Sequence, residues 1–530
     1  MRKIKLIFLL LINLSAAAQN TNTTDLKLLF PADMTCVPQQ FYRLRADGKP
    51  GREIKVVFKD EKFSGKAQLE IKTGGIKEIT EVLSVNGGQN DYQILLPPDA
   101  SVKSAAQVTI TLRQGAKSLK KTFVVPALRH WTIYIYPHSH VDIGYTNTQD
   151  NVEILHKRNI DEGIKLAEAT KDYPAGAGYR WNPEITWPLE RYWQSATFAD
   201  KERVIQAIKS GYLCIDASYL NLNTSVCSDE ELFQIFRFSR EMQKLTGVPM
   251  KTLQQMDIPG ISWGLVPVMA QQGIRYIMMW PNGCRAGNGR SVDEKPFWWV
   301  GPDGKSRILF FQPGSYGNSG SMTKGGTTGR PWFGQRDPDK VPAVIKTGSA
   351  NVNFLEALSK REKSDNPYSF YVVSWSLWDN CPLDADVPDA VKAWNNEYAY
   401  PHIVIAGGTE IMQMIEKNYG EKLPVVRGEF NEYWTDGLGT AARLTAINRN
   451  AKERLVQVET LWSMLHSGKP APRAAYDEAW RYIALGSEHT WCAENPTEPF
   501  FQDAIWKGKQ RYFREADERT QSLMDEVLAP

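Results

Sequence analysis

Cysteine is scarce in this chain and has no metal-binding spacing. Six Cys residues occur among 530, and no two form a C-x-x-C pair. They stand at positions 36, 214, 227, 284, 381 and 492. This scatter argues against a cysteine-based metal site and does not require a disulfide framework. Cys214 and Cys227 could pair with each other, although buried free thiols are the favoured alternative.

The chain also lacks an excess of charge of one sign. Its 63 basic and 60 acidic residues leave a formal net charge of +3. Binding a polyanion depends on a field of Lys and Arg, which this balance does not provide. Nucleic acid is therefore not an expected partner.

No apolar run is long enough to span a membrane. The longest candidate, residues 6–14, follows Arg2, Lys3 and Lys5 and precedes a Ser-Ala-Ala-Ala stretch. This layout predicts a secretory signal peptide over residues 1–19, with cleavage after Ala18. We expect an exported protein, periplasmic or extracellular, that has no membrane segment after cleavage.

The remaining pattern predicts a multidomain protein with three kinds of architecture. Residues 24–127 read as short alternating strands divided by Gly, Asn, Pro and Asp, which is typical of an Ig-like β-sandwich. Residues 128–425 alternate strand and helix, which indicates a mostly parallel α/β unit. Residues 426–530 are mainly helical and predict a C-terminal helical bundle.

A short motif at the end of one predicted strand carries the chemistry. Residues 132–136 alternate as a strand, and His138, His140 and Asp142 follow directly. Two residues apart on an extended backbone, His140 and Asp142 leave the same face and can bind one divalent cation, for which zinc is suited. The alternative is that both imidazoles are satisfied polar groups of a loop.

The same stretch, H-S-H-V-D-I-G at residues 138–144, resembles the H-S-H-N-D-P-G signature of glycoside hydrolase family 38, the class II α-mannosidases. Residues 255–264 and 270–276 are similar to that family's D-x-F-G-H-S segment and the strand approach after it. Residues 480–490 resemble its C-terminal ligand helix. The resemblance covers residues 130–530 motif by motif and implies a (β/α)7-like barrel, a glycan substrate and zinc held by His140, Asp142 and His489.

One departure from the family pattern concerns the nucleophile, an Asp that is also the fourth zinc ligand. An ungapped count from Gly211 places Asn223 there. An amide cannot attack an anomeric carbon, although its carbonyl oxygen can bind a metal, so we expect Asn223 as the fourth ligand. Asp216 is the candidate substitute nucleophile, but on an extended strand it faces the side opposite to Asn223. The expected general-acid region, residues 312–320, contains no carboxylate.

Other polar and aromatic residues complete the list of candidates. Asp379 is the preferred general acid or sugar-hydroxyl ligand, with loop capping as the alternative, and Asp257 is a further catalytic candidate. The candidates for substrate binding are His138, Trp187, Trp378, Trp434 and Asp436. For the tryptophans the alternative is packing, because most of 17 Trp residues must lie in cores.

Three functions of different classes remain. The leading one is a secreted, zinc-dependent glycoside hydrolase resembling α-mannosidases. The second is a metal-dependent lyase of an acidic polysaccharide, for which Tyr219, Arg285 and Tyr316 are available as base or charge partner. The third is a glycan-binding protein without catalysis.

Overall fold

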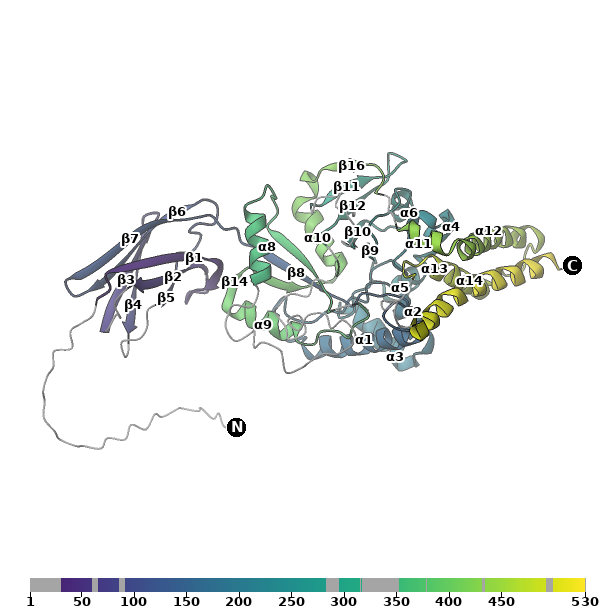
Figure 1. Ribbon diagram of the computed structural model, residues 1–530, viewed down its shortest axis with the longest axis horizontal. Coiled ribbons are helices and arrows are strands. Elements are labelled where there is room, and N and C mark those ends of the chain that lie inside the picture. The colour runs from purple at the N-terminus through teal and green to yellow at the C-terminus, as the bar shows by residue number, and fades with distance from the viewer. Residues whose placement is uncertain are drawn as a thin grey trace, which may run out of the picture.

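The computed structural model describes residues 30–59, 65–84, 91–282, 295–314, 316, 352–377, 379–430, 434–491 and 499–529. Figure 1 shows an elongated molecule with antiparallel sheets at one end, mostly parallel strands in the middle and long helices at the other end. The predicted signal segment lies outside the described residues. The chain thus runs from the sheets, through the central strands, to the helices.

Two four-stranded antiparallel sheets form the N-terminal end, in the orders β14-β1-β2-β5 and β4-β3-β6-β7. Their strands are β1 (Asp33–Leu44), β2 (Pro50–Lys59), β3 (Gly65–Thr73), β4 (Ile76–Ser84), β5 (Asp91–Leu95), β6 (Ala106–Gln114), β7 (Lys117–Val125) and β14 (Tyr398–Tyr400). Alternate residues of both sheets, including Ile54, Leu69 and Ile110, share one buried core. The strands predicted from alternation in this region are confirmed as β2, β3, β5 and β6.

One of these strands comes from far along the chain. β14 pairs with β1, where Tyr42 lies opposite Tyr400. The Tyr42 hydroxyl also donates a hydrogen bond to the main-chain oxygen of Leu128, at 2.6 Å. These contacts attach the N-terminal sheets to the central part of the molecule.

The central strands form two sheets with the orders β13-β8-β15 and β16-β11-β12-β10-β9. They are β8 (Thr132–Pro137), β9 (Thr252–Asp257), β10 (Tyr276–Pro281), β11 (Phe297–Val300), β12 (Arg307–Phe311), β13 (Phe370–Trp375), β15 (His402–Ile405) and β16 (Val425–Arg427). All described pairings are parallel except that of β11 with β12. The mostly parallel α/β pattern expected from the sequence is confirmed.

The sequence pattern predicts strands over residues 179–182 and 212–215, but the structure pairs these segments only through a single bridge between Trp181 and Leu213. They still link the sheets, because the Asn182 amide donates to Pro137 O and the Ala217 amide donates to Thr252 O. Pairing stops early because Pro183 has no amide hydrogen and Glu184 has a φ of 70°. The break places Glu184 beside the end of β8.

Side chains of the central strands alternate between two apolar cores. In β10, Ile277 and Met279 belong to the larger core, and Met278 belongs to the other. The second core collects residues from strands of both sheets, including Leu309 and Phe370. The strands therefore bury both faces, as parallel sheets do, and a helical segment contributes Ile411, Met412 and Ile415 to the second core.

The helices of the central part are α1 (Gln149–Ala169), α2 (Trp187–Ser195), α3 (Phe198–Lys209), α4 (Asp229–Gln234), α5 (Arg237–Thr246), α6 (Leu265–Gln271), α8 (Val352–Glu362), α9 (Val387–Glu397) and α10 (Gly408–Tyr419), with short 3-10 turns at Thr224–Val226 and Gly420–Lys422. Capping boxes start α3 at Thr197 and α4 at Ser228. The alternation of apolar and polar residues over 229–246 predicts a single helix, but the structure has two, because Phe236 between them departs from helical geometry with φ −98° and ψ 1°.

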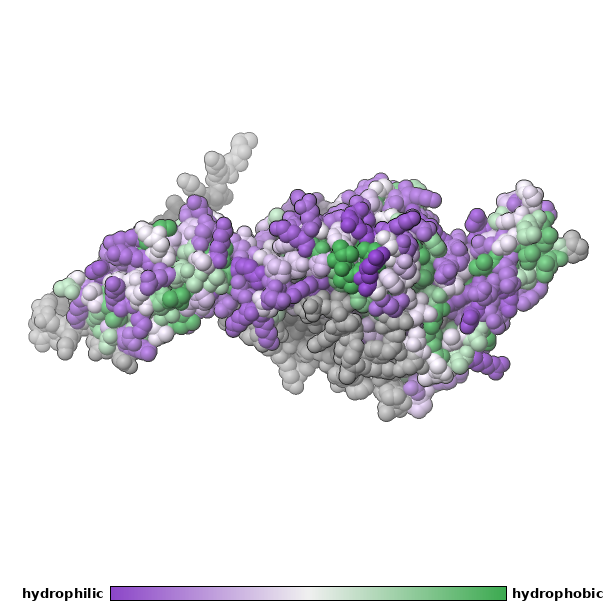
Figure 2. Space-filling view, turned by 90° about the horizontal axis from the view of Figure 1, so that it is seen from above, coloured by the Kyte–Doolittle hydropathy of each residue, from purple (hydrophilic) through white to green (hydrophobic). Residues whose placement is uncertain are grey.

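The C-terminal part is helical, as predicted, and comprises α11 (Thr435–Thr440), α12 (Ala442–Leu465), α13 (Arg473–Ser487) and α14 (Pro499–Leu528). Ala451, Trp480 and Leu523 bring α12, α13 and α14 into one core. In Figure 2, apolar side chains gather at the outer end of these helices, where Met464 and Leu528 are exposed. Among the described residues, no helix combines the length and apolar character needed to cross a membrane.

Candidate metal centre and active site

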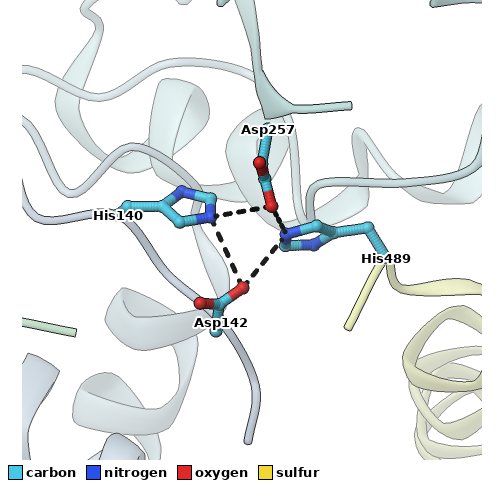
Figure 3. Close-up of side chains that lie close together, drawn as sticks. All are labelled: His140, Asp142, Asp257 and His489. Atoms are coloured by element: carbon cyan, nitrogen blue, oxygen red, sulfur yellow. Dashed lines mark ion pairs between the residues drawn. The ribbon is translucent and has the colours of Figure 1, made fainter. Parts of the chain in front are cut away.

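Four buried side chains converge at the end of the central strands: His140, Asp142, Asp257 and His489. Figure 3 shows the two imidazoles approaching from opposite sides with the two carboxylates between them. Nε2 of His140 lies 3.4 Å from Asp142 Oδ1 and 3.8 Å from Asp257 Oδ2, and Nε2 of His489 lies 3.2 and 3.4 Å from the same atoms. Four ligand atoms about 2.0–2.2 Å from one zinc ion lie about 3.3–3.6 Å apart, so the cluster fits such an ion.

Segments far apart in the chain supply these residues. His140 and Asp142 follow β8, Asp257 is the last residue of β9, and His489 stands two residues after α13 ends. The His489 amide donates to Asn221 O, and Leu222 pairs with Glu488, so the histidine segment lies against the central part. The site therefore needs both the central strands and the C-terminal helices.

Glu184 orients His140. Its Oε1 lies 3.0 Å from Nδ1 of His140 and accepts a hydrogen bond from Asn221 Nδ2 at 2.6 Å. Its Oε2 lies 2.8 Å from Nδ1 of His138. Because Nδ1 of His140 is occupied, Nε2 is directed at the two aspartates, which is the usual carboxylate support of a metal-binding histidine.

Glu488 forms an ion pair with His489, although their contact lacks the alignment of a hydrogen bond. Its Oε1 lies 2.7 Å from Nδ1 of His489, and its Oε2 accepts a hydrogen bond from Lys509 Nζ at 2.9 Å. The Thr490 hydroxyl donates to Glu488 Oε1 at 2.7 Å. Both imidazoles thus present Nε2 to the cluster, and neither Nε2 has a hydrogen-bond partner among the described residues.

Negative charge is in excess around the cluster. Burial opposes protonation of His140, but Glu184 and Asp142 outweigh it and hold its pKa well above the ordinary value. Burial is likewise outweighed at His489, whose pKa is raised by Glu488 and the two aspartates. Buried carboxylates require compensating positive charge. A divalent cation between the Nε2 atoms would supply it.

Asp257 is held in a strained conformation. Its φ is 68°, in the left-handed region that non-glycine residues rarely adopt. Asn282 donates from Nδ2 to Asp257 Oδ1 at 2.6 Å and from its amide to Asp257 O at 2.9 Å. Burial would raise the pKa of Asp257, but hydrogen bonds and charge from His140 and His489 hold it well below the usual range.

Asp379 lies beside His140. The two residues form a parallel bridge, and the next residue, Asn380, donates its amide hydrogen to His140 O at 2.8 Å. Asp379 is 5% exposed. The pKa of Tyr316 is raised by burial and then by the negative charges of Asp257, Asp379 and Asp142. Asp379 therefore borders the four-residue cluster.

The assignment of Asn223 as the fourth ligand stays a prediction, because its side chain is an amide and the cluster comprises carboxylates and imidazoles, with Asp257 as the second carboxylate. Asn223 is fully buried next to the segment that carries His489, where its main-chain N–H donates a hydrogen bond to Ser487 O. Neither polar atom of its side chain has a hydrogen-bond partner among the described residues. The ungapped count could not reveal that the next strand also ends in a carboxylate aimed at this point.

Asp216 lies apart from the cluster. Its Oδ2 accepts a hydrogen bond from the Tyr136 hydroxyl at 2.7 Å, and a Cβ on Gly408 would lie 2.8 Å from its Oδ1. Burial raises its pKa to about 7. This enclosed position among strands differs from the strand-end position that a substitute nucleophile requires.

The residues expected to bind substrate lie in different surroundings. His138 is 2% exposed, with Nδ1 on Glu184 and Nε2 on the Ser374 hydroxyl, so it supports the site from within. Trp187 is 2% exposed in the larger core and is a packing residue. Trp434 lies parallel to the His489 ring, with 6.4 Å between centroids, and is partly exposed beside the site. Trp378 and the side chain of Asp436 lie outside the described residues.

The bases considered for a lyase are poorly placed or protonated. Burial raises the pKa of Tyr219 well above 10, and its hydroxyl donates to Glu190 in a separate network. The ring of Tyr316 lies at an oblique angle to that of His140, with 4.6 Å between centroids, and burial and neighbouring carboxylates raise the pKa of its phenol. Arg285 lies outside the described residues. Nothing in these contacts favours proton abstraction by tyrosine.

Sequence reasoning missed the supporting residues Glu184, Glu488 and Lys509. The signals were present but weak: Glu184 stands in the W-N-P-E-I-T-W stretch, and Glu488 directly precedes His489. Lys509 is 21 residues from Glu488 on another helix, and no sequence pattern links them. Only the packing of α14 brings them together.

Comparisons with known proteins agree with this geometry. Residues 130–431 match the family model described as glycosyl hydrolases family 38 N-terminal domain. The structure is similar to an alpha-mannosidase from Enterococcus faecalis V583, with a TM-score of 0.55 and 18% identity over 75% of this chain and 42% of that one. It is also similar to a protein in the glycosyl hydrolase family 38 from Enterococcus faecalis, with a TM-score of 0.50 and 16% identity over 76% and 40%.

This chain spans about two-fifths of the length of those two proteins. At such identities the likeness concerns the fold. A comparison with curated proteins gives no match. The matched range of the family model contains His140, Asp142 and Asp257, and His489 follows it.

Proposed function

The chain belongs to glycosyl hydrolase family 38, and from this premise we propose that it is a zinc-dependent glycoside hydrolase that cleaves α-mannosides in glycans. The observation that carries the proposal is the buried cluster of two imidazoles and two carboxylates at the strand ends. We extend the proposal to an exported protein with a signal peptide over residues 1–19. It further comprises an Ig-like β-sandwich over 24–127, a (β/α)7-like barrel over 128–425 and a helical bundle over 426–530.

His140, Asp142, Asp257 and His489 would hold the ion. The four nitrogen–oxygen distances of 3.2–3.8 Å support this set, because they lie close to the spacing of ligand atoms around one zinc ion. When bound, zinc is a Lewis acid that can orient neighbouring sugar hydroxyls and stabilise negative charge on oxygen. In the family pattern, the fourth zinc ligand is the residue that aligns with Asn223. In this assignment Asp257 takes that role instead.

Asp257 is the proposed nucleophile. Its low pKa keeps the carboxylate ionised, and Asn282 holds one oxygen in place. The carboxylate oxygen attacks the anomeric carbon while the glycosidic C–O bond breaks and Asp379 gives its proton to the departing oxygen. Water then attacks the same carbon, Asp379 takes the water proton, and the Asp257–sugar bond breaks.

Trapping the covalent intermediate tests this function. The zinc-loaded protein is incubated with an activated fluorinated α-mannoside, which slows the second step, and its tryptic peptides are weighed. The label is expected on the peptide of residues 252–275, in which Asp257 is the sole carboxylate side chain. The D257N variant is the control and should take no label.

Other outcomes assign other roles. A label on the peptide of residues 210–237 that fragmentation places on Asp216, and not on Asp229, Glu230 or Glu231, would move the nucleophile there. If the protein binds zinc and α-mannosides but turns over no aryl mannoside, it is a glycan-binding protein without catalysis. Unsaturated products from uronic-acid polysaccharides would contradict the hydrolase and favour the lyase.

A further inference from the structure

Lys509 on α14 reaches the segment that carries His489. Its ammonium donates hydrogen bonds of 2.9 Å to both the main-chain oxygen and Oε2 of Glu488. It also lies 5.0 Å from the ring centroid of Trp491. The side chain is only 2% exposed. One buried cation thus contacts residues on both sides of His489.

Glu488 transmits this constraint to the imidazole. With Oε2 held by Lys509, its Oε1 meets Nδ1 of His489 at 2.7 Å. The opposite ring atom, Nε2, then lies 3.2 Å from Asp142 and 3.4 Å from Asp257. The direction of the proposed ligand atom therefore depends on where the carboxylate of Glu488 is fixed.

The packing of α14 does not by itself require a charge at this position. Ile505 and Phe513, one turn away on either side of Lys509, are apolar and buried. A buried ion pair is commonly no more stabilising than a well-packed apolar pair, because both charges lose their water. A contribution to stability therefore does not explain why the Lys509–Glu488 pair is buried here, whereas a positioning role does.

We propose that Lys509 is a positioning residue of the metal centre, which fixes Glu488 and thereby directs Nε2 of His489 toward Asp142 and Asp257. This inference rests on the proposed metal role of the cluster. It gives α14 a role in the geometry of the metal centre, although no described residue of α14 belongs to the four-residue cluster.

Zinc affinity of the purified full chain, measured by competition with a chromogenic chelator, tests the inference. The variants are K509M and E488Q/K509M. K509M leaves a buried carboxylate without its cation and is expected to lose stability, whereas the double variant removes both charges and is expected to fold. Thermal melting in EDTA reports folding. We expect the double variant to bind zinc about 10–100-fold more weakly.

A spectroscopic readout separates positioning from general stability. With Co²⁺ in place of zinc, the visible absorption spectrum depends on ligand geometry, and we expect the double variant to change it. The matched control is D503N/K507M. This pair lies on the same helix at 2.5 Å but is 57% and 69% exposed, so its loss should leave affinity and spectrum unchanged.

The possible failures are distinguishable. Wild-type zinc affinity and an unchanged cobalt spectrum in folded E488Q/K509M would overturn the positioning role and leave the metal centre standing. Absence of zinc binding by the wild-type protein would overturn the proposed metal role, and this inference with it.

Discussion

Asp257 shows how one backbone angle can decide the composition of a site. It ends β9 with a φ of 68°, and Asn282 holds both its side chain and its main chain. This conformation turns the carboxylate toward His140 and His489. Strain of this kind costs about 1–3 kcal/mol and persists where surrounding contacts enforce it. The cost is consistent with a functional position.

The roles of Asp257 and Asn223 can be separated by two substitutions. D257N should lower α-mannoside turnover about 10³-fold or more, because it removes the attacking oxygen. It should also weaken zinc binding at least about 10-fold, as loss of a charged ligand exceeds loss of a supporting residue. N223A should keep zinc affinity within a few-fold. Steady-state kinetics measures turnover, and chelator competition measures zinc affinity. A larger loss of zinc affinity in N223A than in D257N would assign the ligand role to Asn223.

Part of this site could be predicted from sequence. His140 and Asp142 share a face because strands have a period of two, and the C-terminal motif identified His489. The direction of Asp257 could not be predicted, because the sign of φ at one residue leaves no periodic signal. Glu184 escaped for the same reason, since its φ of 70° turns it toward the two histidines.

Asp216 should make stability depend on pH. Its folded-state pKa of about 7 lies above the ordinary value of 3.8, so the folded state binds the proton more tightly. Its contribution is therefore complete below pH 4 and is lost as pH rises toward and through 7, by up to about 4 kcal/mol. Urea unfolding of wild type and D216N across pH 4.5–8 measures this. As pH rises, the free energy of unfolding of D216N should increase relative to that of wild type. A difference that does not change with pH would refute the raised pKa of Asp216.

At the scale of elements, one buried carboxylate joins three helices. Glu190 on α2 accepts hydrogen bonds from Arg237 on α5 at 2.7 Å and from Arg481 on α13 at 3.2 Å. Tyr219 donates to it as well. Glu190 is 3% exposed. It therefore connects the central helices with the C-terminal helices.

E190A should destabilise the protein by about 2–3 kcal/mol, because two partly buried arginines lose their carboxylate. The expected loss is below that of a fully buried pair, since the side chains of Arg237 and Arg481 are 21% and 15% exposed. The control is E478A, which breaks the more exposed pair of Glu478 with Arg519, whose side chains are 38% and 34% exposed, and should cost under about 1 kcal/mol. Denaturant unfolding measures both, and equal losses would refute a special role for Glu190.

Element types were more predictable than element limits. Strand alternation and helical periodicity identified β2, β6, α1 and α12 from sequence. The segments around Trp181 and Leu213 were expected as strands, but Pro183 and the turned Glu184 cut their pairing to one bridge. Such local backbone exceptions are tertiary effects, and here they adjoin the site.

At the scale of the whole molecule, the metal centre lies where two parts of the chain meet. His140, Asp142 and Asp257 come from the central strands, and His489 follows the helix α13. A shared ion would stabilise both parts together, because it binds the folded state alone.

Removing zinc with EDTA should therefore lower the melting temperature, and adding zinc should restore it. At zinc concentrations about 1,000 times Kd the stabilisation is about 4 kcal/mol. H489A should melt at the same temperature with and without zinc. Differential scanning calorimetry measures these transitions, and an equal zinc effect in wild type and H489A would remove His489 from the ligand set.

The metal and its ligands can be located directly by anomalous diffraction on both sides of the zinc edge, from crystals of the full chain grown with zinc. We predict one zinc peak bonded to Nε2 of His140 and His489 and to the carboxylates of Asp142 and Asp257, at about 2.0–2.2 Å. No peak between these residues, or a peak bonded to Asn223 in place of Asp257, would contradict the proposed centre.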